Sequence, residues 1–177
     1  DDELLSEAVV GSFTLRWDHR MPFISVAHVS EPSRTLFRTI RRWPFISVGL
    51  ASETSDPIRD GNSQLYEYVW YETSRQTINS VRVSPDRLTM HGEVFGLITK
   101  AHYTLVFHAE SEHQLSFDLN VTATRGTFNR VFLNYWRDER ESFHGFGEQF
   151  TYWNLNGLRV PVLVSEQGVG RGLQPIT

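Results

Sequence analysis

The chain has 177 residues, a mass of 20.5 kDa, and 40% apolar and 13% aromatic residues, which is enough for a sizeable core without covalent staples. A net charge of −4 and a pI near 6.0 argue against nucleic acid and anionic membrane surfaces as partners. The absence of cysteine excludes disulfides, Cys-ligated zinc and Cys nucleophiles. It is compatible with a reducing compartment without proving one, so the compartment stays open, with the cytoplasm slightly favoured. No apolar run approaches about 20 residues, and the acidic start Asp1-Asp-Glu3 is not typical of a signal peptide.

In chain order, the first pattern is residues 3–10, for which one short helical turn is the expected structure. After it the dominant period is two, with apolar and polar residues alternating as they do along half-buried strands. Turn chemistry separates these segments, for example at Ser84-Pro-Asp86 and Arg125-Gly126. Strands are therefore predicted over residues 11–17, 65–71, 80–84, 87–95, 102–108, 114–121 and 130–136.

Many short strands separated by turns, with almost no helical period, predict an all-β fold in which two antiparallel sheets pack as a β-sandwich. The sequence contains no internal repeat and no low-complexity linker. One domain over residues 1–177 is the simplest prediction.

The segment 143–172 is different, because its glycines fall at irregular short intervals among aromatic and polar residues. This composition is typical of a shaped polar surface. Two carboxylates within it, Glu148 and Glu166, are either an acid and nucleophile pair for glycoside hydrolysis or acceptors of backbone hydrogen bonds in glycine-rich bends. The second interpretation is favoured, since sequence spacing does not give their separation.

Aromatic residues of this segment have two interpretations that the sequence leaves equal. They stack on sugar rings, or they pack in a core or between domains. The residues are Phe143, Phe146, Phe150, Tyr152 and Trp153.

Metal and nucleotide sites are not expected. His102 and His108 share a strand face only by alternation, and no pair of histidines has metal-ligand spacing beside an acidic residue. No Lys-Ser/Thr follows either Gly-x-Gly element, so a phosphate loop is not predicted. Asn120 begins an N-glycosylation tripeptide inside a predicted strand, and whether it carries a glycan stays open.

Two elements of the closing segment together resemble a known family, glycoside hydrolase family 31, which contains α-glucosidases and α-xylosidases. They resemble the end of its amino-terminal β-sandwich, and the second element is most similar to the sulfoquinovosidase branch. These elements, with the residues between them, are Phe143-His-Gly-Phe-Gly-Glu-Gln149, Asn156-Gly157, Pro161 and Ser165-Glu-Gln-Gly-Val-Gly-Arg171.

The resemblance implies a galactose-mutarotase-like sandwich that is the amino-terminal part of a larger enzyme. Family members carry both catalytic aspartates on a following (β/α)8 barrel, so no catalytic residue is expected in this chain, which we expect to continue past Thr177. The resemblance implies retaining hydrolysis of an α-glycoside, without metal or organic cofactor. This domain would support the barrel and lend a loop to the rim of its sugar pocket. The candidate rim or interface residues are Phe146, Glu148, Gln149, Phe150, Trp153, Glu166, Gln167 and Arg171.

Three functions of different class follow. The favoured one is the non-catalytic amino-terminal domain of such a glycosidase, whose partners are the barrel and a carbohydrate substrate, an α-glycoside that includes α-sulfoquinovosides as a candidate. The others are a free-standing carbohydrate-binding module and a self-contained hydrolase that uses Glu148 and Glu166. Sugar, linkage and oligomeric state are not readable from the sequence.

Overall fold

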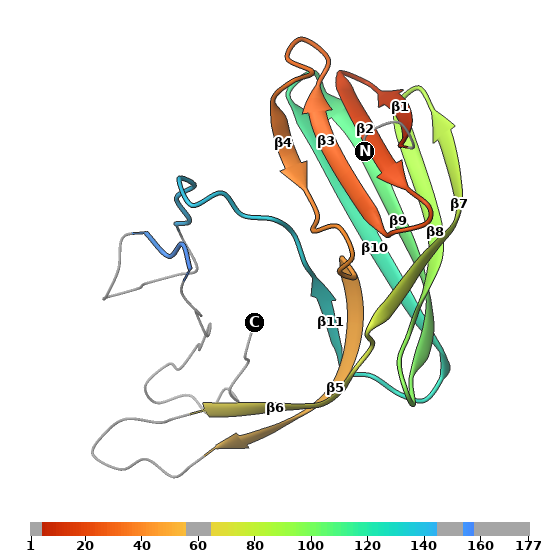
Figure 1. Ribbon diagram of the computed structural model, residues 1–177, viewed down its shortest axis with the longest axis vertical. Helices are drawn as coiled ribbons and strands as arrows, with labels where there is room; N and C mark the ends of the chain where they lie inside the picture. The colour runs from red at the N-terminus through yellow and green to blue at the C-terminus, as the bar shows by residue number, and fades with distance from the viewer. Residues whose placement is uncertain (1–4, 56–64, 145–153, 158–177) are drawn as a thin grey trace, which may run out of the picture. The chain divides into compact units, whose positions relative to one another are not determined.

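The computed structural model describes residues 5–55, 65–144 and 154–157, with backbone only for 53–55 and 65–70 (Figure 1). The chain divides into two compact units, Asp1–Trp136 and Arg137–Thr177. All the strands given below belong to the first unit. Much of the second unit lies outside the described residues, so the single domain over 1–177 stays a prediction.

Two four-stranded antiparallel sheets form the body of the first unit (Figure 1). One sheet has the order β1-β2-β3-β4, and the other has the order β10-β9-β8-β7. The first contains β1 (Ser6–Val10), β2 (Phe13–Asp18), β3 (Phe23–His28) and β4 (Thr35–Arg38). The second contains β7 (Arg75–Ser84), β8 (Arg87–Phe95), β9 (Lys100–Ser111) and β10 (Gln114–Arg125).

A third antiparallel sheet, with the order β11-β5-β6, is built on the long strand β5 (Ile46–Ser55). Its partners are β11 (Arg130–Leu133) and β6 (Leu65–Glu72). The described residues contain no helix, and the predicted all-β, antiparallel sandwich is confirmed.

The core lies between the two four-stranded sheets, because alternate residues of each strand point inward. Leu15 of β2 and Ile24 of β3 face Met90 of β8 and Leu105 of β9 in one buried cluster. The start of β5 joins this cluster. Its fully buried members are Val10, Leu15, Ile24, Phe45, Ile46, Val48, Leu88, Met90, Val94, Ala101 and Tyr103, all at 0–1% exposure.

Buried polar side chains hold β5 to the sandwich. Gln76 of β7 accepts hydrogen bonds through its Oε1 from the backbone amides of Phe45 and Ile46, at 2.8 and 3.1 Å. Thr73 accepts one from the amide of Val48 at 2.9 Å. Since a buried backbone amide without a partner is costly, these side chains replace the ladder bonds that β5 lacks on this side.

The helical turn expected over residues 3–10 is wrong where the structure describes it, because residues 6–10 form strand β1. Gly11 adopts φ +57°, the left-handed region that a tight hairpin requires. The hairpin sets Val10 opposite Phe13 and Ser6 opposite Trp17. Strand pairing therefore overrides the weak helical pattern.

Candidate functional site

The predicted rim residues all fall outside the described parts of the chain. Phe146, Glu148, Gln149, Phe150 and Trp153 lie in 145–153, and the others lie in 158–177. Their roles stay predictions. The described residues of the family-like segment are 143–144 and 154–157.

Asn156 organises the described part of the second unit. Its side-chain nitrogen, Nδ2, donates to the backbone carbonyls of Asp138, Glu139 and Glu141 at 3.1, 3.2 and 2.5 Å. Its side-chain oxygen accepts a hydrogen bond from Arg137. One carboxamide thus satisfies several backbone groups of residues 138–141, which have few ladder partners of their own.

Asn154 makes a second local bridge. Its Oδ1 accepts from the amides of Phe143 and Asn156, both at 3.0 Å, while the amide of Leu155 donates to the carbonyl of Phe143 at 2.8 Å. Gly157, at φ +79°, follows directly and takes a conformation that favours glycine. These bonds give a structural reason for the Asn156-Gly157 pair in the family-like pattern.

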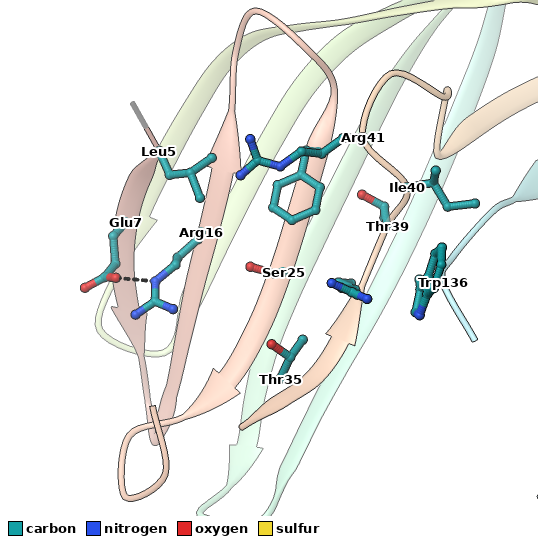
Figure 2. Close-up of a pocket in the computed structure, with 11 residues that line it drawn as sticks. Leu5, Glu7, Arg16, Ser25, Thr35, Thr39, Ile40, Arg41 and Trp136 are labelled. Atoms are coloured by element: carbon teal, nitrogen blue, oxygen red, sulfur yellow. Dashed lines mark hydrogen bonds and ion pairs between the residues drawn. The ribbon is translucent and has the colours of Figure 1, made fainter. Parts of the chain in front are cut away.

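A surface basin of about 840 Å³ lies on the outer face of the β1–β4 sheet (Figure 2). The strand register places Glu7 opposite Arg16, Arg16 opposite Ser25, and Ser25 opposite Arg38. These four side chains form one cross-strand row, which we call the basin row. Adjacent strands lie roughly 4.8 Å apart, so β2 and β4 bring Arg16 and Arg38 to positions about 10 Å apart on either side of Ser25.

Two guanidinium groups of the basin are stacked on aromatic rings. Arg38 lies 4.8 Å from the ring centroid of Trp136, and Arg41 lies 4.7 Å from that of Phe23. A cation–π contact holds each guanidinium over a ring and uses none of its N–H groups as donors to an oxygen acceptor. Figure 2 shows Glu7 and Arg16 at one side of the basin and Trp136 at the other.

One arginine of the basin has a carboxylate partner, and another has none among the described residues. Arg16 Nε donates to Glu7 Oε2 at 2.6 Å. Among the described residues, neither the Arg38 guanidinium nor the Ser25 hydroxyl has a hydrogen-bond partner. The lining includes three arginines and one glutamate, and this glutamate, Glu7, is paired with Arg16.

On the outer face of the other sheet, charged side chains and histidines of β8, β9 and β10 pair with one another. Glu93 contacts Lys100 at 2.8 Å and His102 at 3.3 Å, and His108 contacts Asp118 at 2.9 Å. No group of three or more His, Asp or Glu side chains in the described ranges is arranged to hold a metal ion. No helix in those ranges is long and apolar enough to cross a membrane.

The sequence patterns did not predict the basin, because β1, β3 and β4 were not expected as strands. One signal was present: Phe23-Ile-Ser-Val-Ala27 is a short, mainly apolar run with two β-branched residues, which is typical of a buried strand. The arginines at positions 38, 41 and 42, which stand close together in the sequence, were a second signal. The structure shows that Ile40, between them, lines the basin beside Arg38 and Arg41.

Comparison with known proteins gives partial similarities to two sulfoquinovosidases. The protein from Agrobacterium fabrum (strain C58) is 30% identical over 128 residues, which are 72% of this chain and 17% of that protein. The protein from Escherichia coli (strain K12) is 33% identical over 94 residues, which are 53% of this chain and 13% of that protein. No protein-family model matches, and no solved structure matches significantly.

The two similarities support a relationship to the sulfoquinovosidases of glycoside hydrolase family 31. A glycoside-hydrolase-related origin follows from them. The matched part of the chain spans less than a fifth of the length of either relative.

Proposed function

We propose that this chain is the non-catalytic amino-terminal β-sandwich of a retaining α-glycosidase, of which sulfoquinovosidase is the favoured kind. One observation carries the proposal. A chain whose described residues are all β is similar over 128 residues to a sulfoquinovosidase and matches only 17% of that enzyme's length. Such a share fits one supporting domain of a larger enzyme.

In the proposed enzyme the chemistry belongs to a (β/α)8 barrel that continues the chain after Thr177. Two carboxylates on the barrel act as nucleophile and as acid/base, and a covalent glycosyl-enzyme intermediate gives retention of configuration. No metal or organic cofactor takes part. The substrate is an α-glycoside, with α-sulfoquinovosides the favoured members.

The proposed role of the present domain is support, and the first unit carries exposed apolar side chains that suit it. Leu36, Trp43 and Tyr135 are 46%, 59% and 44% exposed. We call these three residues the edge patch. The segments that carry them are tied together, since the amide of Asn134 donates to the carbonyl of Phe45 and that of Trp136 to the carbonyl of Arg38. Exposed apolar side chains of this size suit a surface that another domain covers.

The proposed rim of the sugar pocket comes from the segment 143–171. Its polar candidates, Glu148, Gln149, Glu166, Gln167 and Arg171, would each need a partner in a core. They suit a surface that meets a second domain and a sugar. Asn156 supports the proposal by holding residues 138–141 in a fixed loop at the start of this segment.

The reading frame that encodes the chain is the first test. The proposal expects it to continue past Thr177 for roughly 250 residues or more of alternating strand and helix patterns. A stop directly after Thr177 would refute the role as an amino-terminal domain.

The second test is catalytic. The purified 177-residue chain is expected not to hydrolyse aryl α-glycosides. Hydrolysis that Glu148→Gln abolishes would instead identify a self-contained hydrolase.

A further inference from the structure

We infer that the outer face of the β1–β4 sheet is a binding site for a small molecule that carries an oxyanion group. The inference concerns a site of the sandwich itself and stands independently of the activity proposed for a larger enzyme. Its centre is the part of the basin row between Arg16 and Arg38. The argument depends on how the strands position these residues and on which of their polar groups are already paired.

The first step is geometric. Arg16 and Arg38 lie on β2 and β4, and the intervening β3 places Ser25 between them on the same face. The resulting span of about 10 Å accommodates an oxyanion that accepts from both guanidinium groups and from the hydroxyl below. Planar guanidinium groups suit this task, because they donate two parallel N–H bonds to a carboxylate, phosphate or sulfate-like group.

The second step concerns unpaired donors. Arg38 is held over the Trp136 ring, yet its N–H groups have no acceptor among the described residues. An arginine that is already held in place and whose donors are unused loses little side-chain entropy when it binds an anion. By contrast, the Nε donor of Arg16 is used by Glu7, so Arg38 is expected to contribute most to binding.

The third step is the chemistry of the ligand. The Arg38 guanidinium has no carboxylate partner among the described residues, and its positive charge favours an anion over a neutral molecule. Trp136 is 49% exposed and lines the same basin; Arg38 lies over one of its faces, and the rest of the ring offers apolar surface next to the charged groups. A compact organic molecule with one oxyanion and one flat apolar face, such as a sugar phosphate, matches both features.

The test uses the 177-residue chain and three probes: inorganic phosphate, glucose 6-phosphate and glucose. Amide NMR shifts are followed during titration at low salt. We expect saturable shifts at Ser25, Thr35 and Thr39 with both phosphates, stronger binding of glucose 6-phosphate, and no saturable shift with glucose. Added salt should weaken binding, because exposed charges are screened.

Variants assign the shifts to the basin. Arg38→Gln should weaken binding at least about tenfold, as expected for a charge-assisted hydrogen bond. Arg38→Lys should recover only part of the loss, since an ammonium group lacks the fork geometry. The control is Arg82→Gln, an exposed arginine on β7 of the other sheet, which should change affinity by less than about twofold.

Two results would overturn the site. One is the absence of saturable shifts at the basin residues in a chain whose circular dichroism shows it to be folded. The other is equal weakening by Arg38→Gln and Arg82→Gln, which would mean adventitious attraction of anions to surface arginines. Neither result bears on whether the chain belongs to a glycosidase, which the reading frame and the activity decide.

Discussion

Tyr103 connects the core to the backbone of β7. It is 1% exposed, and its hydroxyl donates to the carbonyl of Thr77 at 2.8 Å. Burial raises the pKa of this hydroxyl above its ordinary value, and the Gln76 side chain offsets part of the rise. The folded state therefore holds the Tyr103 proton more tightly than the unfolded chain does.

Tyr103→Phe should lower the free energy of unfolding at pH 7 by about 1–2 kcal/mol, because the Thr77 carbonyl loses its buried donor. The raised pKa also predicts an alkaline effect. The contribution of protonated Tyr103 to the free energy of unfolding is complete below the pKa of about 10 that a tyrosine has in the unfolded chain. This contribution is lost as the pH rises above that value. The wild type should therefore lose up to about 1.4 kcal/mol per pH unit there from this one group.

Urea unfolding of both proteins from pH 7 to 11 measures this difference. The variant should show a shallower loss of stability above pH 10. Parallel curves for the two proteins would show that Tyr103 ionises as readily in the folded state as in the unfolded chain.

Asn156 permits a nearly isosteric test in the second unit. Asn156→Asp keeps an acceptor for Arg137 but replaces the donating side-chain amide, so the carbonyls of Glu139 and Glu141 lose this donor, while the Asp138 carbonyl keeps only the backbone amide of Glu141. Amide hydrogen exchange at residues 138–141 should become faster, on the order of tenfold for about 1.4 kcal/mol of lost local stability. Asn120→Asp, at an exposed position of β10, is the matched control. Unchanged exchange at 138–141 would contradict the organising role of Asn156.

At the residue scale, the sequence yields candidate site residues only where they are contiguous in a motif. The segment from Phe143 to Arg171 stood out because its unusual residues are neighbours in the chain. The basin row did not, since Glu7, Arg16, Ser25 and Arg38 come from four strands and only their register brings them together. A contact set by register is not visible in the spacing of single residues.

Individual strands were predictable where alternation is uninterrupted. Strand β8 was predicted over 87–95 and has those bounds, and its burial alternates throughout. Strand β7 was predicted only over 80–84, because a register shift between Ile78 and Ser80 breaks the period of two. A similar shift between Ala123 and Arg125 hid the end of β10.

Strands β4 and β5 were not predicted, for two other reasons. Strand β4 has four residues and a mostly exposed pattern, so it carries little periodic signal. Strand β5 is buried on both faces at its start, from Ile46 to Gly49, where alternation does not apply. The sandwich could still be predicted, because the four strands of the second sheet follow one another along the chain with clear turns between most of them.

Gly92 lies where β8 passes under Tyr103, its register partner in β9. A Cβ at this position would lie 2.0 Å from the Thr77 carbonyl oxygen and 2.5 Å from the Tyr103 ring. Gly92→Ala should therefore destabilise the sandwich by about 1–3 kcal/mol or more, as overpacking does.

Gly96→Ala is the matched control for this change, because the nearest atom to its Cβ, the Thr73 Cα, is 3.1 Å away. It should cost less than Gly92→Ala. Thermal unfolding measures both variants and the wild type. A midpoint for Gly92→Ala equal to that of the wild type would show that the β8–β9 pair adjusts to a methyl group without cost.

At the scale of the whole molecule, the edge patch should behave as surface in the isolated chain. Trp43→Ser should change the free energy of unfolding of the 177-residue chain by less than about 0.5 kcal/mol, as for an exposed position. In the longer protein that we propose, the same substitution should lower the unfolding midpoint, because it removes apolar area from a covered surface. Equal effects in the two proteins would show that no domain covers Trp43.

The most direct test of the central claim compares two proteins on one substrate, an aryl α-sulfoquinovoside. One is the 177-residue chain, and the other is the product of the reading frame continued past Thr177. We predict no turnover by the chain alone, and hydrolysis with retained anomeric configuration, followed by NMR, for the continued protein. Turnover by the chain alone that is lost in Glu148→Gln would contradict the account, because it would place the catalytic carboxylates in this domain.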